Sequence, residues 1–146
     1  MDQLFDTEGL STLTVSELSQ RIGAVLRKGF TAPVWVEGEI HSLSRPASGH
    51  VYFDLVEPSA TGRRLAASIP VVLWESDKHG VNQTLKESGA GLRMTDGLAV
   101  RIRGTVTFYN AQSRVQLQMS AIDPAYTLGR MAAERDRLLQ ALATED

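Results

Sequence analysis

The sequence contains no cysteine, and its 146 residues include no apolar run long enough to cross a membrane. The first absence excludes a disulfide-stapled scaffold and every thiolate metal site. The second excludes an ordinary transmembrane helix, which needs about 20 apolar residues. The first nine residues carry three acidic side chains and no apolar run, so they do not read as a secretory signal peptide. We therefore expect a soluble cytoplasmic protein.

A basic excess, the usual mark of a nucleic-acid binder, is also missing. The chain has 15 Lys and Arg residues against 17 Asp and Glu residues, for a formal net charge of −2. Residues 32–124 hold nine basic and nine acidic side chains. With 42% apolar and 22% charged residues, the composition is that of an ordinary globular domain. Any affinity for nucleic acid must therefore come from how the charges are arranged.

A helix is predicted over residues 14–28, after a leader at residues 1–12 that we expect to be flexible. Thr14 and Glu17 have the spacing of a capping box, and Gly29 is a natural stop. Apolar side chains recur at helical spacing, namely Val15, Leu18, Ile22, Val25 and Leu26. This stripe predicts an amphipathic helix that covers one end of the following domain or packs on its side.

From residue 33 the apolar period changes from 3.6 to 2, and it predicts five strands. They lie at about 33–41, 50–57, 65–75, 97–109 and 114–122. Gly38 suggests a bulge or a sharp coil in the first strand, and Pro70 implies an edge or a bulge in the third. Residues 77–88 are predicted to form a short helix between the third and fourth strands.

This order favours one fold class for residues 13–124, a mainly β protein with a five-stranded oligonucleotide/oligosaccharide-binding (OB) barrel. The N-terminal helix, the helix between strands three and four and a C-terminal helix complete it. Periodicity alone also permits another small barrel, and the position of the middle helix favours the OB-fold.

The C-terminal stretch, residues 125–146, has a heptad pattern. Its seam is formed by Leu128, Met131, Arg135, Leu138 and Leu142. Two heptads are too short for an independent coiled coil, so we expect the start of a longer helix.

Three motifs together resemble the exodeoxyribonuclease VII large subunit. The first runs from Val34 to Ile40 (VWVEGEI), and the second from Ser42 to Pro46 (SLSRP). The third runs from Ser48 to Leu55 (SGHVYFDL). Gly104 to Tyr109, Gln116-Leu117, Leu128-Gly129 and the opening Leu13 to Leu18 also fit the family pattern. The resemblance extends from about Leu13 to Leu142. Pro58, Pro70, the insert Thr61 to Arg64 and a hairpin turn without glycine, Asn110 to Ser113, depart from the pattern.

The resemblance implies the N-terminal OB-fold domain of a bacterial nuclease that degrades single-stranded DNA to oligonucleotides. In that family the catalytic domain lies downstream of the terminal helix, and small subunits bind the long helical region. Nothing in this chain corresponds to the catalytic domain, so the chain is expected to bind DNA without cutting it. No cofactor is expected for this domain; whether the complete nuclease needs a divalent metal stays open.

Barrels of this class bind nucleic acid with the face of strands two and three and with the loops between strands one and two and strands four and five. Single-stranded DNA needs cations for its phosphates and flat side chains on which bases stack. The candidates in the first loop and second strand are Ser42, Ser44, Arg45, Ser48, His50 and Tyr52. Those in the last hairpin are Arg101, Arg103, Tyr109 and Arg114.

Each candidate also has a structural interpretation. Arg45, which precedes Pro46, fits a loop-shaping role equally well. Arg101 and Arg103 fit a solvated strand face, or a pair with an acid across the sheet, better than a phosphate contact. Tyr52 and Tyr109 suit packing as well as stacking. The three histidines are too scattered for a metal site, and Glu37 and Glu39 lack a partner for hydrolysis.

Three hypotheses follow from the sequence. The first is a module that holds single-stranded DNA for the nuclease. The second is an architectural module that docks on another protein surface, for which the neutral charge would be the signature. The third, an independent enzyme, predicts nuclease activity of this chain alone, and we expect none.

Overall fold

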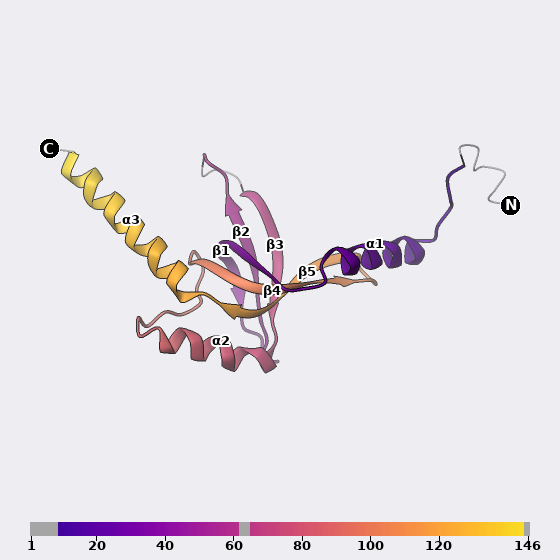
Figure 1. Ribbon diagram of the computed structural model, residues 1–146, viewed down its shortest axis with the longest axis horizontal. Coiled ribbons are helices and arrows are strands. Elements are labelled where there is room, and N and C mark those ends of the chain that lie inside the picture. Colours follow the sequence, from indigo (N-terminus) through magenta and orange to yellow (C-terminus); the bar gives the residue numbers. More distant parts are fainter. Residues whose placement is uncertain (1–8, 62–64, 145–146) are drawn as a thin grey trace.

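The computed structural model describes residues 9–61 and 65–144 and confirms the predicted fold class (Figure 1). The elements are α1 (Val15–Gly29), β1 (Val34–Ser44), β2 (Val51–Pro58), β3 (Leu65–Leu73), α2 (Glu75–Glu87), β4 (Ala99–Tyr109), β5 (Arg114–Ile122) and α3 (Pro124–Thr144). The strands form a closed barrel in the order β1-β2-β3-β5-β4. Residues 1–8 of the predicted leader and residues 62–64 of the insert lie outside the described residues. No helix of the described part is long and apolar enough to cross a membrane.

Two seams between strands that are distant in sequence close the barrel. β1 pairs antiparallel with β4, from Val34 opposite Gly104 to Glu39 opposite Ala99. β3 pairs parallel with β5 at Val71–Leu117 and Val72–Gln118. Pro70 lies one residue before this second seam, so its missing N–H does not interrupt the β3–β5 pairing.

Two glycines let neighbouring strands approach closely enough for closure. A Cβ on Gly38 would lie 2.8 Å from Cγ of Leu55, and a Cβ on Gly104 would lie 2.6 Å from Cγ of Leu117. Of the two features predicted at Gly38, a bulge or a sharp coil, the bulge is wrong, because the β1–β4 register is continuous there. The register shifts instead lie between His41 and Ser44 in β1, between Glu57 and Pro58 in β2, and opposite Arg103 and Gly104 of β4.

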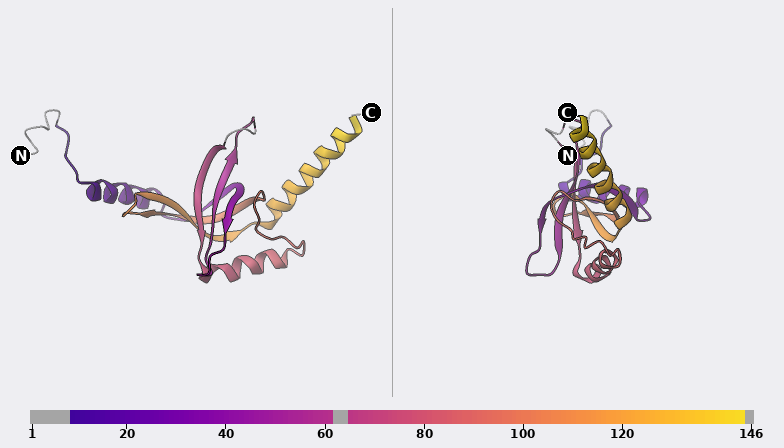
Figure 2. Two further views of the ribbon diagram at one scale, coloured as in Figure 1. Left: turned by 180° about the vertical axis from the view of Figure 1, so that it is seen from behind. Right: turned by 90° about the vertical axis from the view of Figure 1, so that its left-hand side faces the viewer.

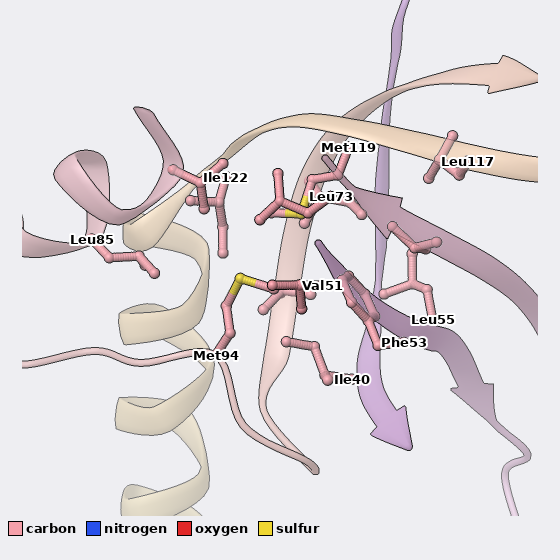
Figure 3. Packing of buried hydrophobic residues seen from close by; sticks show 14 residues of the cluster. Ile40, Val51, Phe53, Leu55, Leu73, Leu85, Met94, Leu117, Met119 and Ile122 are labelled. Carbon is pink, nitrogen blue, oxygen red and sulfur yellow. The ribbon is translucent and has the colours of Figure 1, made fainter. Parts of the chain in front are cut away.

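The core fills the barrel and continues beneath it to α2. Fourteen buried apolar residues make one cluster, and Figure 3 shows ten of them labelled. Leu85 of α2 and Met94, from the segment between α2 and β4, enter this cluster from outside the barrel (Figure 3). α2 is therefore fixed in rotation by its buried side, formed by Val81 and Leu85.

The helix α1 begins as predicted but packs with a face beside its apolar stripe. Thr14 accepts a hydrogen bond from the amide of Glu17, and the Glu17 side chain accepts one from the Thr14 amide, so the capping box is complete. The prediction that the apolar stripe packs on the barrel is wrong, since Val15, Leu18 and Val25 are 81%, 51% and 69% exposed. The buried residues are Ser19 and Gly23, which meet the β4–β5 hairpin.

The helix α3 leaves the barrel on the side away from α1 (Figures 1 and 2). It is anchored at its start, where the buried Thr127 hydroxyl donates to the Ala99 carbonyl over 2.8 Å. Three members of the predicted heptad seam, Met131, Leu138 and Leu142, are exposed. Most of the seam is therefore uncovered by the described residues.

The two close approaches predict a sharp contrast between two glycine substitutions. Gly104→Ala should lower the free energy of unfolding by about 1–3 kcal/mol, because its new methyl group collides with Leu117 in a packed core. Gly80→Ala is the control, since Gly80 lies inside α2 with nothing near its added Cβ. It should raise stability by about 0.5–1 kcal/mol. Urea unfolding followed by circular dichroism measures both, and equal effects would refute the close approach.

Candidate nucleic-acid interface

A row of side chains crosses the outer surface of all five strands. Cα partners on neighbouring strands point to the same face of a sheet. The register pairs Ser44 with Tyr52, Tyr52 with Val72, Val72 with Gln118, and Gln118 with Thr105. Since Val51 and Phe53 point into the core, Tyr52 and its partners face outward. We call Ser44, Tyr52, Val72, Gln118 and Thr105 the cross-barrel row. Val72 is 1% exposed, and the other four members supply two hydroxyls, an amide and one aromatic ring, but no acid.

The cross-barrel row has an unused acceptor beside it. Gln116 lies one outward step from Gln118 along β5 and is opposite Thr107. It is 7% exposed, and its Oε1 accepts no hydrogen bond from any described residue. A buried amide oxygen without a donor is costly, so this position favours a ligand or solvent donor.

The loop after β1 is tied to the segment that precedes β4. β1 runs past its predicted end at His41 through a bulge at which Ser42 has a φ of 57°. The amide of Leu43 donates to Asp96 Oδ1 over 2.8 Å, and the guanidinium of Arg45 donates to the carbonyl of Met94 over 2.9 Å. The predicted contacts Ser42, Ser44, Arg45 and Ser48 are all exposed around this loop. The loop-shaping and binding roles of Arg45 are thus compatible.

His50 caps a helix. Its Nδ1 accepts a hydrogen bond from the amide of Glu75 over 3.0 Å, at the start of α2, where Trp74 supplies no side-chain cap. The imidazole also meets the ring of Trp74 edge-on at 4.8 Å and that of Tyr52 at 6.4 Å. His50 therefore braces Tyr52 against α2, and Nδ1 is not available as a phosphate donor.

Arg101 is held by the protein itself. Its guanidinium pairs with Asp123 at 3.0 Å and lies over the Trp35 ring at 4.4 Å. Asp123 also accepts the amide of Ala125, at the start of α3. Arg103 donates from Nε to the hydroxyl of Ser120 over 3.1 Å and stays exposed.

The last hairpin presents Tyr109 and Arg114 at its tip, where they are Cα partners. Both are exposed, Tyr109 by 44%. The turn without glycine is made by Ser113, which adopts a φ of 50°. The Ser19 hydroxyl of α1 donates to the Asn110 carbonyl over 2.5 Å, so α1 holds the tip in place.

The predicted residues therefore fall into three groups. Those of the first loop lie with Tyr52 at one end of the cross-barrel row, and Tyr109 with Arg114 forms a second group at the hairpin tip. Arg101 and Arg103 lie on the β1–β4 side, opposite Glu37 and Trp35 respectively. Thr105 and Val72 were missed, because their place depends on cross-strand register, which the strand pattern alone does not give.

The β1–β4 side carries two acids beside its arginines. Glu37 and Glu39 face outward near Tyr126 and Arg130. Burial and then the negative charge of Glu37 raise the pKa of Tyr126. His41 Nε2 lies 3.3 Å from Glu39 Oε1. Glu37 and Glu39 would repel a phosphate backbone at this acidic part of the β1–β4 side. Within the described residues, no group of three or more His, Asp or Glu side chains is placed to hold a metal ion.

Barrel topology, middle helix and cross-barrel row together define an OB-fold. The chain belongs to the family of OB-fold nucleic acid binding domains, whose model matches residues 13–123. It is 38% identical to the exodeoxyribonuclease 7 large subunit of Pseudomonas fluorescens (strain SBW25) over 133 residues, 91% of this chain and 25% of that protein. The values for the large subunit of Azotobacter vinelandii are the same. The chain thus spans about a quarter of the length of these curated relatives.

Among solved structures, a mitochondrial single-stranded DNA binding protein from S. cerevisiae is similar at a TM-score of 0.43. The match covers 64% of this chain and 93% of that one, at 10% identity. A likeness this distant supports no conclusion about this chain.

The contacts of the two arginines predict different effects on stability. Arg101→Ala should lower the free energy of unfolding by about 1 kcal/mol, because it removes both an ion pair and a ring contact. Arg103→Ala, which removes one exposed hydrogen bond, should stay within about 0.5 kcal/mol of the parent. Urea unfolding compares them, and the reverse order would contradict the structural role of Arg101.

Proposed function

We propose that this chain is the single-stranded-DNA-binding domain of an exodeoxyribonuclease VII large subunit, and that it binds and positions DNA without cutting it. The cross-barrel row carries this proposal. It offers hydrogen-bonding groups on β1, β4 and β5 and an aromatic ring on β2, and it does not include Glu37 or Glu39. Membership of the OB-fold nucleic acid binding family supports the same function.

Each part of the interface has a role in this proposal. A base stacks on Tyr52, and Gln118 and Thr105 donate to or accept from neighbouring bases and sugars. Arg45 at the Ser44 end of the row and Arg114 at the hairpin tip attract phosphates, with the hydroxyls of Ser42, Ser44 and Ser48 as further donors. Stacking and phosphate contacts tolerate any sequence, so this domain holds DNA without reading it.

The relatives are about four times as long as this chain, and a proposal about the whole protein rests on them. We propose a cytoplasmic nuclease that degrades single-stranded DNA to oligonucleotides, with its catalytic residues outside this chain. Its small subunits would bind the helical region that α3 begins, where Leu138 and Leu142 are exposed. The DNA-holding domain itself would need no cofactor.

Loss of the aromatic ring should weaken DNA binding. Tyr52→Leu is expected to raise the Kd for a labelled oligo-dT roughly 5- to 150-fold, because stacking contributes about 1–3 kcal/mol per base. Fluorescence anisotropy at low salt measures this. Tyr126→Leu is the matched control, since Tyr126 is a half-buried tyrosine near Glu37 and Glu39. Equal loss in both variants, or no binding by the folded parent at any salt, would rule out contact through the row.

Charge substitutions should act in opposite directions on the two sides of the barrel. Arg45→Ala should weaken oligo-dT binding several-fold at low salt and reduce the slope of log K against log salt by about 0.7. Glu37→Ala should leave binding unchanged or strengthen it, because it removes an anion. The same titration at four salt concentrations gives both results. An unchanged slope for Arg45→Ala would show that this cation touches no phosphate.

A second candidate function is the architectural module, in which the barrel docks on another protein surface. The exposed apolar face of α1, with Val15, Leu18, Ile22 and Val25, favours it. It predicts that Tyr52→Leu and Arg45→Ala leave the Kd for oligo-dT unchanged. The DNA titrations above therefore separate the two candidates.

A further inference from the structure

A basic surface lies beside the barrel, next to the Ser44 end of the cross-barrel row. A pocket of about 630 Å³ opens between α2, the Gly89–Met94 segment and the loop that follows β1. Its lining includes the cations Arg45, Lys78, Lys86 and Arg93 and no acidic residue. We call it the basic pocket.

Helix geometry places two of these cations on one wall. Lys78, Asn82 and Lys86 recur every four residues along α2 and therefore share a face. Val81 and Leu85 occupy the neighbouring positions and are buried against the barrel. With its apolar side anchored, α2 presents the two lysines to the pocket.

The opposite wall is built by a reversal of the chain after α2. Gly89 and Gly91 have φ angles of 72° and 67°, a conformation that side chains disfavour. The chain then returns along α2 until the buried Met94 fixes it to the core (Figure 3). Arg93 precedes this anchor, and Arg45 reaches the same point through its hydrogen bond to the Met94 carbonyl.

The positive charge of the pocket is not neutralised within the described residues. Arg45 and Lys78 make contacts with the carbonyls of Met94 and Gly49. The ion pairs of the described part of the chain include none of the four cations. Nearby acids within the described ranges form no ion pair with these cations. Asp96 accepts from the Leu43 amide, Glu87 accepts from Gln83 on α2, and the carboxyl group of Glu75 lies near Gly49.

We propose that the basic pocket binds phosphate groups. Four cations around one cavity repel one another, and a multiply charged anion relieves that repulsion. Guanidinium and ammonium groups are the side chains that bind phosphate oxygens. The volume is that of a small-molecule site rather than a single-ion site, so it accommodates a nucleoside phosphate or one phosphate-sugar unit of a strand.

Two sources of phosphate have this chemistry. Ser44 of the cross-barrel row is followed directly by Arg45 of the pocket, so a strand that leaves the row at this end meets the pocket with its backbone. A free phosphate compound would enter the same cavity without the row. The first source deepens the function proposed above, and the second is independent of it.

The experiment has two arms on the complete chain. In the first, Lys86→Gln combined with Arg93→Gln should reduce the salt slope of oligo-dT binding by about 1.4, because each phosphate contact contributes about 0.7 for a single strand. In the second, pyrophosphate added to the parent should shift backbone amide resonances over residues 78–94 and at Arg45, and the double variant should lose these shifts.

Arg130→Gln combined with Arg135→Gln, both exposed on α3, is the control for net charge. A slope change confined to the pocket variant identifies the strand as the source, and pyrophosphate shifts without a slope change identify a free phosphate compound. Equal slope changes in both variants without pyrophosphate shifts, or no response in either arm, overturn the proposal. No response in either arm would indicate an acidic protein segment, and not phosphate, as the occupant of the pocket. If the parent binds pyrophosphate but no DNA, the proposed function is refuted, whereas phosphate binding by the basic pocket stands.

Discussion

The close approach of strands at two inward-facing glycines is the constraint on which the molecule depends. Gly38 and Gly104 leave room for Leu55 and Leu117, so β1, β2, β4 and β5 can coil into a closed barrel. Closure aligns residues that are far apart in sequence, since Ser44 and Thr105 belong to opposite ends of the domain and share one row. The surface that could hold a strand is therefore a product of packing inside the barrel.

The middle of the chain has no net charge, but its basic and acidic side chains are separated in space. Of the nine basic residues in 32–124, seven are described, and four of these line the basic pocket. Glu37 and Glu39 lie on the β1–β4 side, where Arg101 is paired with Asp123. Net charge governs long-range attraction, whereas binding responds to the local arrangement. A weakly acidic protein can in this way present a strongly basic pocket.

Local patterns predicted what depends on local geometry. The capping box of Thr14 and Glu17, the hairpin of β4 and β5 and the position of α2 are all set by residues close together in the chain. The buried face of α1 was not predictable from its apolar stripe, because Ser19 and Gly23 fit the hairpin by being small. Nor was the role of His50, whose partners Glu75 and Trp74 are some 25 residues away. The residue type predicts a hydrogen-bonding ring at His50, but its partners in the fold make that ring a helix cap.

The attachment of α1 has a consequence for motion. The helix touches the hairpin tip through Ser19 and Gly23, and the core does not extend into it. Little apolar area is lost when such a contact opens, so the local unfolding free energy of α1 is far below that of the barrel. Its amide hydrogens therefore exchange with solvent through a separate opening event. In that event the helix detaches while the five strands stay closed, and the hairpin tip with Tyr109 and Arg114 loses its contact with Ser19.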